Sequence, residues 1–174
     1  NNATLAFNRS DAVTVANAIS GTGALSQVGA GTTSLTGANT YSGLTSISAG
    51  TLQSGDGGTT GTLGTGATTN DAILLFNRSD ALTIASAISG AGVVNQIGTG
   101  TTSLTGANSY SGTTTISAGT LQVGAGGAAG TLGSGAVTNN AALAFNRSDT
   151  IAVANAISGT GNLTQAGTGT TSLT

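Results

Sequence analysis

The sequence has no cysteine, proline, methionine, tryptophan or histidine, and only 5% of its 174 residues are charged. The absence of cysteine excludes disulfides and thiol chemistry. Three arginines are the only basic side chains and the net charge is −2, so there is no basic surface that would attract nucleic acid. Catalysis depends on titratable side chains. Because they are so few here, we expect no enzymatic activity, no cofactor and no metal.

Glycine and apolar residues are abundant, with 30 glycines and 37% hydrophobic residues. Glycine follows no three-residue period, which excludes a collagen helix. Disordered chains are highly charged and poor in apolar residues, so this composition argues against disorder. No apolar run approaches the roughly 20 residues of a membrane-spanning helix, and we expect that this segment does not span a membrane.

The sequence is a repeat with a fixed period. The word FNRSD occurs at equal intervals, at Phe7–Asp11, Phe76–Asp80 and Phe145–Asp149, and it contains every arginine of the chain. We divide the chain into unit 1 (1–69), unit 2 (70–138) and a partial unit 3 (139–174), which together form one continuous array. Since unit 3 stops within the repeat and the chain does not begin with methionine, we expect it to be a piece of a longer protein.

Short stretches of alternating apolar and small or polar residues fill each unit, separated by Gly, Asn, Ser and Thr. This alternation predicts half-buried strands, and the stretches are too short and too rich in glycine for helices. A β-sandwich and a β-solenoid both fit, but only a solenoid explains the repetition. We therefore predict an all-β fold, a parallel β-helix in which each unit forms three coils of about 23 residues.

The predicted core contains one group of apolar residues for each coil. In unit 1 these are Leu5, Phe7, Val13, Val15 and Ile19, then Leu25, Val28 and Leu35, then Ile47, Leu52 and Leu63. The equivalent positions of the other units mostly stay apolar, as a packed interior requires. Asn17, Ser86 and Asn155 occupy one polar position of this pattern, and we expect them to bond main-chain groups at a corner.

The segment Leu25–Gly55 strongly resembles the autotransporter-associated β-strand repeat, also called the passenger-associated transport repeat. The words GAGTTSLTG, ANTYSG and SAGTLQ carry the resemblance, and Val94–Gly124 is a second copy. The resemblance implies a right-handed parallel β-helix in the passenger of a bacterial type V secretion protein. Such passengers cross the outer membrane unfolded and fold outside, which implies a location at the bacterial cell surface or outside the cell. The part of each unit that contains FNRSD resembles the spacer between such repeats.

The word FNRSD is the strongest candidate site. Arginine presents a planar fork that binds carboxylate or phosphate, so the pairs could clamp a ligand. The candidate surface contacts here are Arg9, Asp11, Arg78, Asp80, Arg147 and Asp149. We favour a simpler interpretation, in which Asn, Ser and Asp turn a corner and each ion pair is solvated and weak. Three coils per unit would place the three arginines in a row along one edge, roughly 14 Å apart.

Tyr41 and Tyr110 recur in the ANTYSG and ANSYSG words and complete the candidate surface contacts. They could stack on sugars, but we favour a structural role in which the hydroxyl is hydrogen-bonded.

Three weaker motifs are set aside. Asn8-Arg9-Ser10 and its copies have the form of glycosylation sequons. Ser54–Gly58 resembles a calcium-binding turn, but Ala125 replaces Asp56 in unit 2. The glycine-rich words lack the lysine of a phosphate-binding loop.

These observations predict a non-enzymatic structural segment of a bacterial surface or secreted protein. It would form a rigid stalk that assists its own export and displays or mediates adhesion. Its partners would be neighbouring repeats of the same chain, other copies joined end to end or laterally, and a host or matrix surface. Two alternatives are a subunit of a self-assembling extracellular filament and, with less support, an ice-binding solenoid with a threonine face.

Overall fold

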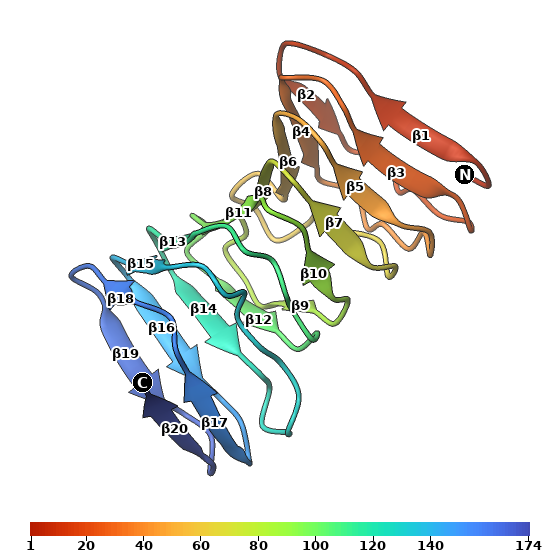
Figure 1. Cartoon of the computed structure of the whole chain (residues 1–174). Coiled ribbons are helices and arrows are strands. Elements are labelled where there is room, and N and C mark those ends of the chain that lie inside the picture. Colours follow the sequence, from red (N-terminus) through yellow and green to blue (C-terminus); the bar gives the residue numbers. More distant parts are fainter.

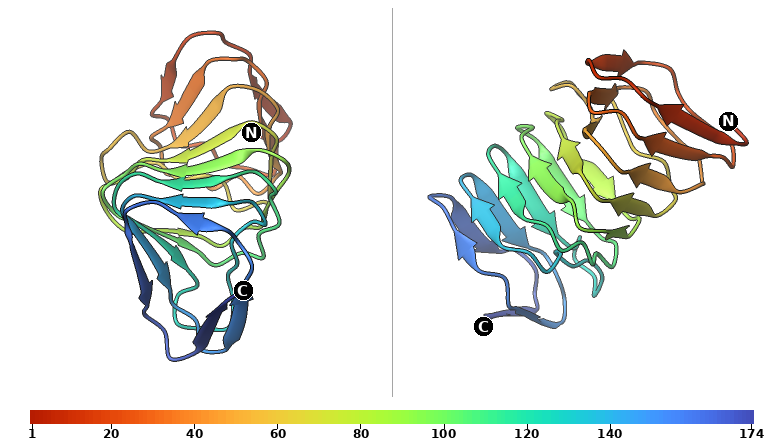
Figure 2. Two further views of the ribbon diagram at one scale, coloured as in Figure 1. Left: turned by 60° about the vertical axis from the view of Figure 1, so that its left-hand side comes forward. Right: turned by 45° about the horizontal axis from the view of Figure 1, so that its top comes forward.

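The computed structural model describes residues 1–174 and contains 20 short strands and no helix. The chain winds as a stack of coils, with the two termini at opposite ends of the stack (Figure 1). Figure 2 shows the same stack from two further directions. With no helix in the fold, there is none long and apolar enough to cross a bilayer. The predicted all-β parallel solenoid is therefore confirmed.

The coils have three faces, which we number in the order in which the chain crosses them from the N-terminus. The second face is a continuous sheet along the stack. It contains eight strands in parallel order. They are β2 (Val13–Val15), β4 (Thr32–Leu35), β6 (Thr51–Ser54), β8 (Ile73–Phe76), β11 (Val93–Gln96), β13 (Thr114–Ile116), β15 (Val137–Asn139) and β18 (Ile157–Ser158).

The first and third faces are interrupted sheets. The first face begins with β1 (Thr4–Phe7), β3 (Ala24–Gln27), β5 (Thr45–Ile47), β7 (Thr68–Asn70) and β10 (Ile88–Ser89). After two irregular segments it ends with β17 (Thr150–Val153) and β20 (Thr170–Leu173). The third face begins with irregular segments and continues with β9 (Leu82–Ile84), β12 (Thr101–Leu104), β14 (Thr120–Val123), β16 (Ala142–Phe145) and β19 (Asn162–Gln165).

The register of the strands gives the coil length. Leu5 pairs with Leu25, and Leu25 pairs with Thr45, so these two coils are equal in length. Thr45 then pairs with Thr68, so the next coil is three residues longer. The extra residues lie in an extended loop after β6, at residues 55–61, and residues 124–130 form the same loop in unit 2. We call these two segments the corner loops.

We call each strand or irregular segment that crosses one face of a coil a wall segment. Each unit contains ten wall segments, one more than three coils need. Unit 1 has seven strands, β1–β7, and three irregular segments around Ile19, Asn39 and Leu63, which makes ten. Unit 2 has eight strands, β8–β15, and two irregular segments around Asn108 and Leu132, which also makes ten. Ten segments on three faces are three coils and one further face. The expected division into three whole coils is wrong, because each unit starts one third of a turn beyond the previous one.

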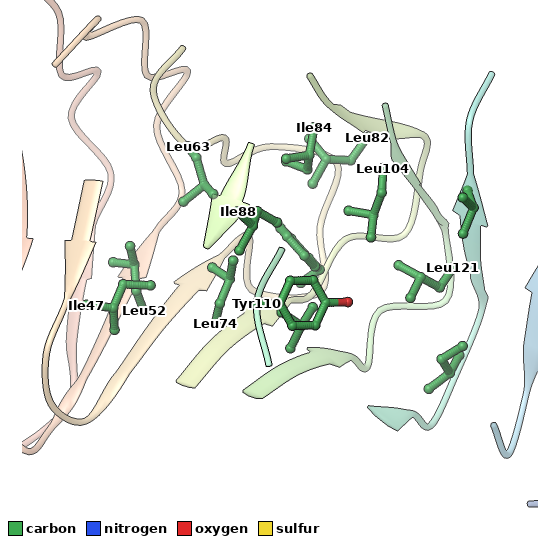
Figure 3. Close-up of a cluster of buried hydrophobic side chains, with 14 of the residues drawn as sticks. Ile47, Leu52, Leu63, Leu74, Leu82, Ile84, Ile88, Leu104, Tyr110 and Leu121 are labelled. Carbon is green, nitrogen blue, oxygen red and sulfur yellow. The ribbon is translucent and has the colours of Figure 1, made fainter. Parts of the chain in front are cut away.

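The core is a row of aliphatic and aromatic side chains that point inward from all three faces (Figure 3). Leu25, Leu35 and Leu52 have no exposed surface, as the alternation predicts. Val28 is an exception, because it is 39% exposed and lies outside the core. Its neighbour Gln27 takes the inward place of β3, so the residue after it points outward.

Candidate functional site

Arg78 of the second FNRSD word holds the corner loop of the preceding coil. Its guanidinium donates hydrogen bonds to the carbonyl oxygens of Gly61, at 2.9 Å, and Thr59, at 2.6 Å. The same group makes two parallel hydrogen bonds with the carboxylate of Asp80, at 2.8 and 2.7 Å. The side chain is only 11% exposed. The planar fork of arginine is therefore used within the chain, where it joins two consecutive coils.

Arg147 repeats this arrangement in the third word. It donates to the carbonyl oxygens of Gly130 and Ala128 in the second corner loop, and it pairs with Asp149. Main-chain hydrogen bonds support the contact, because the N–H of Gly126 donates to the Asn146 carbonyl at 2.8 Å. The hydrogen bonds from Arg147 hold the pKa of the Asp149 carboxyl below its usual range. We call Arg78 and Arg147, with their acidic partners, the loop clamps.

Arg9 has the same sequence context but different surroundings. Its guanidinium donates two hydrogen bonds to the Asp11 carboxylate, at 2.8 and 2.6 Å, and has no other hydrogen-bond partner. Its side chain is 54% exposed, and no corner loop lies against it among residues 1–174. Arg9 is thus solvated as expected, whereas the arginine side chains of the two loop clamps are only 11% and 9% exposed. The expected weakness of the ion pairs stays a prediction.

The three arginines do not form a row along one edge. Phe7 ends a strand of the first face, Phe76 ends one of the second face, and Phe145 ends one of the third face. The arginine that follows each of them therefore lies at a different corner of the coil. The expected row is wrong because it assumed a whole number of coils in each unit.

Substitution of Arg147 by glutamine is expected to release the second corner loop. Removing hydrogen bonds from a nearly buried charged group should lower stability by about 2 kcal/mol, and it should speed amide exchange at Gly126 and Ser148. Both amides bond across this contact. The matched control in the same segment is Arg9→Gln, which removes only an exposed pair and should leave the stability nearly unchanged. Equal losses in the two variants would show that the loop contact contributes nothing.

Tyr41 and Tyr110 are fully buried, so neither presents a surface to a partner. Each hydroxyl forms a 2.8 Å hydrogen bond with a threonine of the same motif, Thr45 or Thr114. Burial raises the pKa of the Tyr110 phenol, and the bond to Thr114 offsets part of that rise. The candidate role as a surface contact is corrected for both tyrosines, since their rings fill the interior beneath Gly64 and Gly133.

Two asparagines that were not among the predicted site residues each join three successive coils by hydrogen bonds. The side-chain oxygen of Asn39 accepts the N–H of Ile19 at 2.8 Å, and its amide donates to the Thr62 carbonyl at 2.7 Å. Asn108 makes the equivalent bonds to Ile88 and Thr131. The signal was present in the sequence, because both asparagines directly precede the Thr-Tyr or Ser-Tyr of the recurring motif.

The remaining candidate motifs lie at the corners. Asp56 is an exposed residue of the first corner loop. The structure brings together no group of three acidic, histidine or cysteine side chains around a metal position.

Comparison with known proteins agrees with the fold. A family model described as the passenger-associated transport repeat matches residues 25–53 and 94–123. A relative described as "Adhesin BmaC autotransporter", from Brucella suis biovar 1, is 52% identical over 56 residues. That match covers 32% of this chain and 2% of the relative. No solved structure matches the chain.

The two matched segments share the same structural features. Each includes a buried tyrosine, the asparagine that joins three coils, and strands on at least two faces. Residues 25–53 and 94–123 are thus similar to the passenger-associated transport repeat, and both lie in the same parallel β-solenoid.

Proposed function

We propose that this chain is a non-enzymatic segment of the passenger of a bacterial autotransporter-like surface protein. It forms a stiff rod outside the cell, assists its own export, and displays or mediates adhesion. The observation that carries the proposal is that both matched segments, residues 25–53 and 94–123, belong to one stack, in which each coil forms hydrogen bonds with the one before it.

The energetics of such a stack suit a chain that folds after export. Each coil contacts only its neighbours, so stability is the sum of local terms and folding can spread from coil to coil. The chain has no cysteine, so it reaches this structure without disulfides. Its outer surface has few charges and its arginine pairs hold the coils together, which supports a structural role over a catalytic one.

The geometry gives less support to ice binding. An ice-binding face needs a regular array of one residue type, whereas each face here carries a different wall segment on every successive coil. On the second face, the outward side chains of successive strands include Ser34, Gln53, Leu75 and Asn95. A filament of many copies stays a second candidate, and electron microscopy of the full protein would recognise it by many chains per fibre.

The export role can be tested in the full-length protein on the bacterium that produces it. Tyr41→Ala combined with Tyr110→Ala should destabilise both transport repeats and reduce the surface-exposed passenger several-fold, measured with an antibody on intact cells. Gly127→Ala, an exposed corner-loop change whose methyl group would meet no atom within 4 Å, is the matched control and should leave the amount unchanged. If the purified segment of the tyrosine variant is unfolded and the surface amount on cells is nevertheless normal, the role in export is contradicted.

The adhesion role needs a separate measurement. Cells that carry equal amounts of surface passenger are compared for attachment to host cells and to matrix-coated surfaces, with and without residues 1–138. If deletion of residues 1–138 abolishes attachment, and beads coated with purified segment 1–174 attach to the same surfaces, adhesion belongs to the segment itself. Loss without such binding would support display, and unchanged attachment would contradict both.

A further inference from the structure

Two equivalent clefts interrupt the wall of the solenoid, one in each unit. The first has a volume of about 330 Å³ and lies on the third face between residues 62–65 and 82–86. The second has a volume of about 380 Å³ and lies on the first face between residues 131–132 and 151–155. The two positions are one sequence period apart, and they lie on different faces because each unit is rotated by one third of a turn.

The first cleft is a gap in the hydrogen-bond ladder. No main-chain hydrogen bond joins 62–65 to 82–86, and β9 is an edge strand there that pairs only with β12. The other two faces of the same pair of coils are fully paired, through β5 with β7 and β6 with β8. Figure 3 shows Leu63 on one side of this region and Leu82 and Ile84 on the other. The two coils are therefore joined on two faces and separate on the third.

A side-chain bridge crosses the second gap and is absent from the first. In the second cleft the amide of Asn155 donates to the carbonyl oxygens of Gly133, at 2.8 Å, and Gly135, at 2.6 Å, and so bridges the coils. This confirms the expected corner bonding for Asn155. The equivalent residue in the first cleft is Ser86, which makes no such bond. The equivalent carbonyl oxygens are those of Gly64 and Gly66, and they accept no hydrogen bond from the protein.

We propose that the ladder gaps are hinges of the rod, that the hinge at Ser86 is free, and that the amide of Asn155 latches the other. Two neighbouring coils that are hydrogen-bonded on two faces can tilt apart on the third face, because local stability follows the local density of hydrogen bonds and packing. The identity of one residue, serine or asparagine, then sets whether a unit bends. Successive hinges open on successive faces, so the direction of bending changes by one third of a turn from unit to unit.

The absence of natural cysteine allows a direct test with paired spin labels. Labels at Thr65→Cys and Thr83→Cys span the first cleft, and labels at Ser134→Cys and Ala152→Cys occupy the equivalent exposed positions of the second. The distance distribution across the first cleft should be about twofold wider than across the second, since opening of a locally unpaired region costs less than opening of a bridged one.

Reciprocal substitutions identify the latch. Ser86→Asn should narrow the first distribution to the width of the second, and Asn155→Ser should widen the second to the width of the first. Circular dichroism of each variant confirms that the fold is retained. Equal widths in the unmodified pair, or no response to both substitutions, would overturn the proposal. If one variant fails to fold, the other still decides it, because each predicts a change of opposite sign.

Discussion

Replacement of Gly133 by alanine is expected to destabilise unit 2 by about 3 kcal/mol, at the upper end of the usual range for overpacking. The added methyl group would lie 2.2 Å from the carbonyl oxygen of Tyr110 and 2.4 Å from its ring. Neither neighbour can move away cheaply. The ring is fully buried, and the carbonyl accepts a hydrogen bond from Ser134 at 2.8 Å. Urea unfolding followed by circular dichroism measures the loss, and amide exchange locates it to unit 2.

Gly127→Ala is the matched control for this substitution. Gly127 lies in the corner loop of the same coil, and a methyl group there would meet no atom within 4 Å. We expect a change of less than about 0.5 kcal/mol, as for surface positions in general. If both substitutions had the same effect, the close approach of the backbone to Tyr110 would not be what requires glycine at position 133.

Tyr110→Ala is expected to cost about 3–5 kcal/mol, the range for removal of a large buried aromatic side chain. The ring has no exposed surface and lies among the buried aliphatic side chains of neighbouring coils (Figure 3). Tyr110→Phe keeps the ring and removes only the hydrogen bond to Thr114, so it should cost about 1 kcal/mol. Local amide exchange in coils on either side measures both effects, because stability in a solenoid is local.

The comparison separates packing from hydrogen bonding. The same pair of substitutions at Tyr41 should give the same order, since Tyr41 is also fully buried and bonded to a threonine. If the phenylalanine and alanine variants lost equal stability, the hydrogen bond of the hydroxyl, and not the packing of the ring, would be the main contribution to stability.

The sequence alone predicted the strands, the parallel solenoid and most of the core, because alternation of side chains determines which residues of a strand point inward. It failed where a polar residue occupies an inward place. Gln27 is 1% exposed, and its amide donates to the carbonyl oxygens of Gly29 and Gly31 while its oxygen accepts from Thr33. A glutamine that satisfies its hydrogen bonds inside cannot be distinguished by polarity from one at the surface.

The same limitation explains the error in the winding. Two wall segments have no anchor in the predicted core: the irregular segment around Asn39, and β7, whose sequence is Thr-Thr-Asn and which carries no apolar residue. Its inward side chains, Thr68 and Asn70, are nevertheless fully buried. One group of apolar anchors for each coil, with Val28 counted among them, gave three whole coils, whereas ten wall segments add one further face.

The burial of the arginines could not be predicted from their own surroundings in the sequence. All three FNRSD words are identical, yet Arg9 is exposed and Arg147 is not. The difference comes from residues 124–130, which precede Arg147 by a full coil and stack on it. Side chains in a solenoid meet neighbours that are a whole coil away along the chain, as Leu5 meets Leu25. Local motifs therefore determine only half of each environment.

The tenth segment has a consequence for how such a rod can change in length. Gain or loss of one unit alters the length by about 16 Å, given a spacing of about 4.8 Å between coils. It also turns everything beyond the change by a third of a revolution about the rod axis. A feature at the far end would then point in a new direction relative to the base. Only gains or losses of three units together would leave its direction unchanged, so length and orientation cannot vary independently in this protein.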